Sequence, residues 1–192
     1  SPERPKPRKK PREKPGFEGG ELALSMASFL SGISATAWIN GSNANMVAPL
    51  HYKDLIIPSI TPIALPDPET EGNRGSVIPI ERSSSRFLFT TPEDDRNWNI
   101  KNLLFLQICS VLFSFHHQVV MYPRAGHFLE VPYMPHCPSG FHPAFGQVVV
   151  FGGEAKAHHQ AQLDLWRMFQ EFFRKHLDGN NTAQKATLYT RG

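Results

Sequence analysis

The stretch that decides the fold is Gly19–Gly41, GGELALSMASFLSGISATAWING. Its first half repeats apolar residues at spacings of three, four and seven on a background of Ala and Ser, at Leu22, Met26, Phe29 and Leu30. This spacing predicts a helix of about three turns, packed on one face and stopped by Gly32. The second half, ATAWING, is an apolar run closed by Asn-Gly, which is typical of a buried strand. A helix followed at once by a buried strand indicates an α/β fold.

The same alternation continues along the chain. The runs RFLFTT (86–91) and HQVVMYP (117–123) predict two more strands, and NLLFLQICSVLFSF (102–115) predicts a buried helix between them. A last helix is expected over Ala155–Leu177, with one apolar stripe made of Leu165, Trp166, Phe169, Phe172 and Phe173. Strands that alternate with helices predict a mostly parallel sheet flanked by helices.

Three segments lie outside this alternation. Residues 1–15, SPERPKPRKKPREKP, hold seven Lys or Arg and two Glu, so they contribute +5 while the rest of the chain sums to −2. Because they have no large apolar residue to bury, we expect a disordered basic arm, then one domain over 16–178 and a flexible tail over 179–192. Residues 42–80 are rich in Pro, Asn and Gly and lack periodicity, which predicts a long surface excursion of the kind that forms a lid.

The composition predicts in which compartment the chain is located and which kinds of partner or cofactor it lacks. Cys109 and Cys137 lie far apart without a C-x-x-C spacing, which favours a reducing compartment. We see no signal peptide, and the chain ends in YTRG rather than S-K-L, so we expect a cytoplasmic location by default. The longest apolar run, 102–115, is shorter than the ~20 residues that span a bilayer. The basic charge belongs to the arm, so we expect no nucleic-acid partner. The histidines lack a metal-ligand spacing, and we expect no metal or cofactor.

Two residues suited to acid and base chemistry follow two successive predicted strands. Asp95 lies in the loop after RFLFTT, and His127 lies in the loop after HQVVMYP. Because sites in parallel α/β sheets form outside the carboxyl ends of the strands, both side chains are expected to face one crevice. An Asp that orients a His base is the relay of a hydrolase triad in the order nucleophile, Asp, His. Asp94 competes for the acid role, and the alternative is that both residues are ordinary loop residues.

From Gly19 to about Leu177 the chain resembles the catalytic domain of the type I acyl-CoA thioesterases and bile acid-CoA:amino acid N-acyltransferases. The resemblance is carried by GGELALSMASFL, ATAWINGS, VAPLHYKD, FLFTTPEDDRNW, MYPRAGHFLEVPYMPHC and VVVFGGEAKAHHQAQLDLWRMFQEFFRKHL. It implies the carboxyl-terminal part of an α/β-hydrolase fold, with Asp95 and His127 as the charge-relay acid and base. It also implies fatty acyl-CoA as the substrate, hydrolysed through a serine nucleophile to free fatty acid and CoA, with CoA present only as part of the substrate. In the transferases an amino acid accepts the acyl group, and we consider this activity the less probable of the two.

The chain departs from this family where the nucleophile belongs. The family pattern G-x-S-x-G corresponds to GFEGG (Gly16–Gly20) shifted by one residue, which puts Phe17 at the nucleophile position. A phenyl ring cannot attack a carbonyl, so no covalent route exists there. Ser34, in GISAT, precedes a strand instead of following one. Cys109 lies in an apolar helix and Cys137 in a Pro-rich segment, so neither is a convincing replacement.

The segment before Gly16 raises a second difficulty. A central strand should end there, but KKPREKP occupies its place, and proline and charges do not fit a buried strand. We therefore expect an unpaired sheet edge and a truncated thioesterase-family chain that is inactive or very weakly active. The alternative is a non-catalytic protein that pairs this edge with itself or with a full-length relative, or that binds acyl-CoA. A third possibility is that residues 1–17 come from a misassigned gene boundary.

Overall fold

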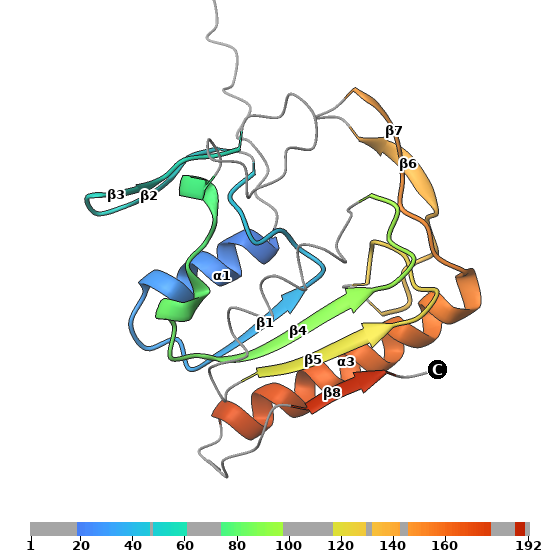
Figure 1. The fold of residues 1–192 in the computed structure, drawn as a ribbon. Coiled ribbons are helices and arrows are strands. Elements are labelled where there is room, and N and C mark those ends of the chain that lie inside the picture. The colour runs from blue at the N-terminus through green and yellow to red at the C-terminus, as the bar shows by residue number, and fades with distance from the viewer. Residues whose placement is uncertain are drawn as a thin grey trace, which may run out of the picture.

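The computed structural model describes residues 19–46, 48–60, 74–97, 117–129, 132–142 and 146–177, together with the backbone of 187–190. A four-stranded parallel sheet lies at its centre (Figure 1). The strands are β1 (Ala35–Ile39), β4 (Arg86–Pro92), β5 (His117–Tyr122) and β8 (Thr187–Thr190), in the spatial order β1-β4-β5-β8. In this register Leu88 lies between Ala37 of β1 and Gln118 of β5. The predicted parallel sheet is confirmed, and its carboxyl ends all lie at the same edge.

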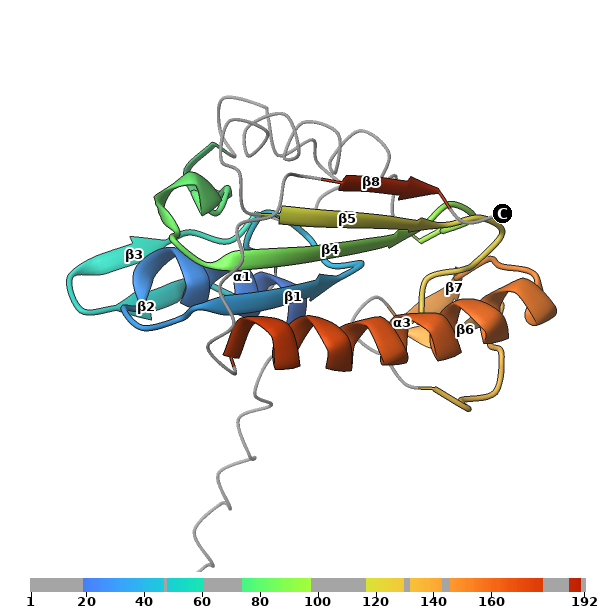
Figure 2. The ribbon, with the colours of Figure 1, turned by 90° about the horizontal axis from the view of Figure 1, so that it is seen from below.

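Helices α1 (Gly19–Phe29) and α3 (Ala155–Leu177) cover opposite faces of this sheet (Figure 2). Successive side chains of a strand point to opposite faces, so each strand contributes to two cores. The core under α1 contains Leu24, Ala27, Trp38, Ile78, Ile80, Phe87, Phe89 and Val119. The core under α3 contains Leu88, Val120, Tyr122, Ala125, Leu129, Ala161, Leu165, Met168 and Phe172. Each fully buried large apolar side chain contributes roughly 1.5–3 kcal/mol, so the two cores hold the three layers together.

The helix predicted at the start of the deciding stretch is present, but it buries a different face. Leu22 and Met26 are 43% and 40% exposed, whereas the buried residues are Glu21, Leu24, Ser25 and Ala27. The cause is a close approach of two backbones, because a Cβ atom on Gly20 would lie 2.7 Å from the Cα atom of Gly41. Only glycine permits this contact, which brings the start of the helix onto the segment after β1 and turns its small-residue face inward.

The predicted carboxyl-terminal helix is confirmed with the same bounds, but of the predicted apolar stripe only Leu165 and Phe172 are buried, while Phe169 and Phe173 are half-buried. Leu165 and Phe172 are 1% and 4% exposed, but Trp166 is 44% exposed. Adjacent positions of a helix point about 100° apart, so Leu165 and Trp166 cannot both face the sheet. Trp166 stacks on Phe169 instead, with ring centroids 5.6 Å apart. The buried stripe consists of His158, Ala161, Gln162, Leu165, Met168 and Phe172.

The segment 42–80, expected to be a surface excursion, is partly buried in the part that the structure describes. Asn45 N–H donates to the Ser76 carbonyl at 2.9 Å, and Ile78 N–H donates to the Asn43 carbonyl at 2.8 Å. The Asn45 amide also donates to the carbonyls of Ala48 and Ile57, at 2.7 and 3.1 Å. Such side-chain donors allow irregular backbone to be buried, which the sequence pattern did not reveal. The remaining elements are β2 (Leu50–Tyr52), β3 (Leu55–Ile57), η1 (Arg74–Ser76) and η2 (Ile80–Arg82).

A second hairpin, β6 (Ser139–His142) and β7 (Gln147–Val150), lies near the carboxyl edge of the sheet (Figure 1). Residues 187–190, which the sequence placed in a flexible tail, form β8 and pair with β5. Their sequence TLYT is rich in β-branched and aromatic residues, which favour a strand. The predicted helix 102–115 and the basic arm 1–15 lie outside the described residues. In the described part of the chain, no helix has both the length and the apolar character needed to span a membrane.

Candidate active site

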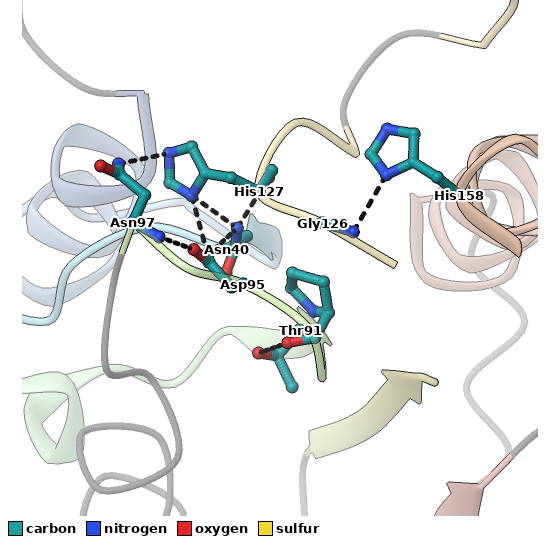
Figure 3. Close-up of polar contacts among 8 residues, drawn as sticks. Asn40, Thr91, Asp95, Asn97, Gly126, His127 and His158 are labelled. Carbon is teal, nitrogen blue, oxygen red and sulfur yellow. Dashed lines mark hydrogen bonds and ion pairs between the residues drawn. The ribbon is translucent and has the colours of Figure 1, made fainter. Parts of the chain in front are cut away.

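The two residues predicted to form a relay lie together at the carboxyl edge of the sheet (Figure 3). The Nδ1 atom of His127, in the loop after β5, is 2.8 Å from Oδ2 of Asp95, in the loop after β4. The side chains of His127 and Asp95 are 11% and 2% exposed. A hydrogen-bonded ion pair or dipole of this kind is stronger where water is excluded. The geometry therefore pairs an imidazole with a buried carboxylate in the manner that the strand order predicts.

Backbone hydrogen bonds fix the two loops against each other. Glu93 N–H donates to the Tyr122 carbonyl at 3.0 Å, and Asp94 N–H donates to the Ala125 carbonyl at 3.0 Å. The sheet pairing of β4 and β5 thus continues past the ends of both strands. His127 N–H donates to the Phe151 carbonyl at 2.9 Å, which ties the same loop to the segment after β7.

Asn40 joins the relay from a third strand. It lies directly after β1 with a φ of +48°, and it is 3% exposed. Its side-chain amide donates to Oδ2 of Asp95 at 2.8 Å and to the carbonyl of His127 at 2.7 Å. Asn tolerates the left-handed backbone region better than most residues, which suits it to this sharp turn. The amide therefore links the acid to the backbone of the base.

Asn97 completes the ring of partners around the imidazole. Its backbone N–H donates to Oδ1 of Asp95 at 2.7 Å, and its side-chain amide lies 3.1 Å from Nε2 of His127. The Asn40 amide nitrogen lies 3.0 Å from the other ring nitrogen, Nδ1. An amide nitrogen can only donate, and a neutral imidazole accepts at one ring nitrogen, so the two amide contacts belong to different tautomers. The tautomer with its proton on Nδ1 is the one in which His127 donates to Oδ2 of Asp95 and accepts at Nε2. In this tautomer the lone pair of Nε2 is the one available to a reacting group.

This arrangement suits a general base that is backed by a carboxylate. His127 can take a proton at Nε2 while Asp95 stabilises the imidazolium that forms. Two aromatic rings lie against the imidazole, Phe151 with centroids 5.8 Å apart at 12° and Phe128 with centroids 5.0 Å apart at 58°. They restrict the rotation of the His127 ring and limit its contact with water.

Asp94, the competing candidate for the acid role, is directed elsewhere. Its Oδ2 accepts a hydrogen bond from Gly153 N–H at 3.0 Å, and its Oδ1 pairs with Arg96 at 3.2 Å. The Arg96 and Asp94 side chains are 65% and 38% exposed, so this pair adds little to stability. Asp94 holds the loop before α3 in place, and Asp95 is the carboxylate that faces His127.

The nucleophile candidates are not placed beside Nε2 in the described residues. Ser34 is exposed and precedes β1, at the edge of the sheet opposite to the site, where its carbonyl accepts a hydrogen bond from Arg86 N–H at 2.9 Å. Cys137 is exposed, and its thiol donates to the Ser139 carbonyl at 3.2 Å. Phe17 and Cys109 lie outside the described residues.

The other histidines have separate environments. His158 is 3% exposed and accepts a hydrogen bond from Gly126 N–H at Nδ1, at 3.1 Å. Burial lowers the pKa of His158 below its ordinary value of 6.5.

Over the described ranges, no group of three or more His, Cys, Asp or Glu is arranged to hold a metal ion. A pocket of about 400 Å³ opens nearby, between the end of β5 and the start of α3, and is lined by Arg124, Lys156 and Asp164 among others, but not by His127 or Asp95.

Several residues of the site were not identified from the sequence. Asn40 was interpreted only as half of an Asn-Gly turn, and Asn97 only as part of the polar loop EDDRNW. One signal was available, because Asn40 follows a predicted strand and so lies at the same sheet edge as Asp95 and His127. The contacts themselves join residues 55 and 87 positions apart, which no local pattern encodes.

Comparison with known proteins gives a consistent family. The family model described as BAAT / Acyl-CoA thioester hydrolase C terminal matches residues 17–71 and 64–179. Human acyl-coenzyme A thioesterase 6 is 39% identical over 194 residues, which cover 90% of this chain and 46% of that protein. Human acyl-coenzyme A thioesterase 2, mitochondrial, is 38% identical over 188 residues, which cover 85% and 38%. Mouse acyl-coenzyme A thioesterase 1 is 41% identical over 180 residues, which cover 83% and 42%.

The chain thus spans less than half the length of these curated relatives. The family match runs through β1, β4, β5 and α3, which are the elements that carry or support Asn40, Asp95 and His127. The chain belongs to the acyl-CoA thioesterase and BAAT family and corresponds to its carboxyl-terminal part.

Proposed function

We propose that this chain is the charge-relay part of an acyl-CoA thioester hydrolase, built on a partial α/β-hydrolase fold. The observation that carries the proposal is the 2.8 Å contact between His127 and Asp95 at the carboxyl ends of two adjacent parallel strands. The names of its relatives, acyl-coenzyme A thioesterases, support a fatty acyl-CoA as the substrate. CoA enters only as part of that substrate, and the proposal includes no other cofactor and a cytoplasmic location.

The reaction of a complete site follows from the roles of these groups. His127 accepts the proton of a serine hydroxyl at Nε2 while the serine oxygen attacks the thioester carbonyl. The C–S bond then breaks, the CoA thiolate leaves with the proton from His127, and an acyl-serine remains. Water attacks this ester while His127 takes its proton, the bond between the acyl carbon and the serine oxygen breaks, and His127 returns the proton to that oxygen as the fatty acid leaves. Asp95 holds the imidazole in the reactive tautomer in both steps. Transfer to an amino acid in place of water is the less favoured variant.

The proposal for this chain is inactivity or very weak activity. Phe17 stands at the nucleophile position of the sequence and has no atom that can form the acyl intermediate. Loss of the serine from a hydrolase triad costs on the order of a million-fold in turnover. From a typical rate of about 10 per second this leaves on the order of one event per day. Such a residual rate comes from substrate binding and the rest of the site.

A second candidate function is pairing with another chain. Within the described sheet, β1 is paired with β4 and lies at an edge. Unpaired N–H and C=O groups on such an edge can bind a further strand. A second copy of this chain or a full-length relative is the proposed partner. Sedimentation at increasing concentration tests this, and a monomer at all concentrations, alone and mixed with a full-length relative, contradicts it.

The catalytic proposal is tested by CoA release from a long-chain acyl-CoA. The monodisperse chain is compared with His127→Ala and with His159→Ala, which changes an exposed histidine outside the relay. We expect no release above background from any of the three, with all of them folded by circular dichroism. Turnover above about 0.1 per second that is lost in His127→Ala and kept in His159→Ala contradicts inactivity, because it requires a substitute nucleophile.

A further inference from the structure

Two side chains of α3 reach the loop that carries His127. His158 and Gln162 are four positions apart, so they lie on the same face of the helix. Both are buried, at 3% and 2% exposure, although His and Gln are polar. Buried polar side chains cost free energy unless they are hydrogen-bonded, so their partners matter.

Their partners are the backbone groups on the two sides of His127. Gly126 N–H donates to Nδ1 of His158 at 3.1 Å, and the Gln162 amide donates to the Phe128 carbonyl at 3.3 Å. The backbone of Phe128 also lies near enough to His158 to raise its pKa. Figure 3 shows the ring of His158 extending from its helix to the amide of Gly126, on the opposite side of the loop from Asp95. His158 and Gln162 thus form hydrogen bonds with the backbone of the residues before and after His127.

Close packing leaves this loop little room to shift. A Cβ atom on Gly126 would lie 2.3 Å from the carbonyl oxygen of Gly152, in the segment before α3. A Cβ atom on Gly153 would lie 2.5 Å from the nitrogen of Gly126. The backbone of Gly126 therefore packs directly against the backbone of Gly152 and Gly153, with no side chain between them. A small displacement of α3 moves the loop directly.

The hydrogen bond from Gly126 to His158 depends on the charge of His158. Nδ1 can accept from Gly126 only when it carries no proton, so the ring must be neutral with its proton on Nε2. Burial lowers the pKa of His158, and the nearby His136 and His159 lower it further, while the backbone of Phe128 acts the other way. The ring of His136 lies 5.2 Å from that of His158. The loops packed here also carry the Arg124–Glu154 ion pair and Asp94.

We propose that His158 and Gln162 are positioning residues for His127, which hold the backbone on both sides of it so that its Nδ1–H points at Asp95. This rests on the proposed function, in which His127 is the base. The two residues touch neither substrate nor reacting atoms, and they act only through the placement of the imidazole.

The test uses the full chain labelled with ¹⁵N-histidine and amide ¹⁵N. Two signals are followed by NMR, the hydrogen-bonded Nδ1–H proton of His127 and the solvent exchange of the His127 amide. The amide of Val120, in the core of β5, serves as the internal reference for global opening. The Gly126 amide is not used, because it responds to the loss of its own acceptor in any case.

Four variants separate positioning from bulk stability. His158→Phe removes the acceptor of the Gly126 amide, His158→Asn keeps an acceptor near the place of Nδ1, and Gln162→Met removes the amide at similar volume. His159→Gln is the matched control on the exposed side of α3. In His158→Phe we expect loss of the Nδ1–H signal and at least about tenfold faster exchange of the His127 amide. We expect Val120 exchange to be unchanged, His158→Asn to restore most of the signal, and Gln162→Met to show a smaller effect in the same direction.

A folded His158→Phe chain with wild-type His127 signals overturns the proposal. If His158→Phe does not fold, Gln162→Met decides, and unchanged His127 signals in that variant overturn it. Equal acceleration at His127 and Val120 also overturns it, since that indicates global destabilisation alone. All of these signals are read without substrate, so acyl-CoA turnover that disappears in His127→Ala would refute the proposed inactivity and leave the placement of His127 by α3 established.

Discussion

The side-chain amide of Asn40 donates to Oδ2 of Asp95 at 2.8 Å, which joins the end of β1 to the loop after β4. The same nitrogen donates to the carbonyl of His127, so one amide connects the three strand ends that form the site. Because Asn40 also has a φ of +48°, its side chain and its backbone serve the site in different ways. Two substitutions distinguish these contributions.

Replacing Asn40 by Gly removes the amide but accommodates the positive φ, whereas Ala removes the amide and strains the backbone. We expect Asn40→Gly to lower the free energy of unfolding by about 1–3 kcal/mol, the cost of buried groups left without partners. Asn40→Ala should lower it by a further ~1 kcal/mol. Urea unfolding measures both, and a Gly variant less stable than the Ala variant would show that backbone strain at this position is unimportant.

Replacing Asp95 by Ala removes the acceptor of three donors at once. These are Nδ1–H of His127, the amide of Asn40 and the backbone N–H of Asn97. We expect a loss of about 2–4 kcal/mol in the free energy of unfolding, together with loss of the Nδ1–H proton signal of His127. Asp54→Ala, in the exposed turn between β2 and β3, is the control and should change stability by less than about 0.5 kcal/mol. Equal effects of the two substitutions would contradict a buried network at Asp95.

Replacing Gly126 by Ala tests the close packing beneath His127. Its Cβ atom would lie 2.3 Å from the Gly152 carbonyl oxygen, so the loop must move. We expect a destabilisation of about 3 kcal/mol or more and a change in the His127 imidazole resonances. Gly146→Ala is the control, because Gly146 has a φ of +64° and no atom within 4 Å of the added Cβ. It should cost only the strain of the left-handed conformation, about 1–2 kcal/mol, and leave the His127 resonances unchanged.

Stability should decrease as the solution is acidified below pH 6.5. Burial lowers the pKa of both His158 and His176 in the folded chain below the ordinary value of 6.5. The unfolded chain then binds more protons than the folded chain between the folded and unfolded pKa values, so the stabilisation present above pH 6.5 is lost as the pH falls through this window. Urea unfolding at several pH values measures the slope. His158→Asn should flatten it and His51→Asn, in the exposed strand β2, should not, and the reverse pattern would contradict this assignment.

Much of the fold could be predicted because its elements are long and periodic. The strands β1, β4 and β5 are apolar runs, and the helix Ala155–Leu177 repeats apolar residues at helical spacing. The inward face of α1 could not be predicted, because the contact of Gly20 with Gly41 decides it. The burial of residues 43–45 depends on the side-chain amide of Asn45, whose acceptors lie in other segments. β8 is only four residues long and follows a segment rich in polar residues.

The placement of Asp95 and His127 could be predicted because parallel strands bring their carboxyl ends to one edge. The residues that form hydrogen bonds with Asp95 and His127 could not be predicted, because each is brought there by the fold and not by its place in the sequence. Asn97 lies only two residues after Asp95, yet its amide faces His127, which is 30 positions away. The sequence assigns no role to His158 beyond the lack of a metal-ligand spacing, and its position beside the His127 loop is a consequence of where α3 packs.

We propose a relay pair in a chain where Phe17 stands at the nucleophile position of the sequence. Intact-mass spectrometry after incubation with excess long-chain acyl-CoA tests it most directly, with Cys137→Ser as the background so that the exposed thiol cannot be acylated. We expect an unmodified mass for this chain and for the same chain carrying His127→Ala. An acyl adduct that forms in the chain with His127 and is absent from His127→Ala would contradict this expectation, because it would identify a nucleophile that the relay activates.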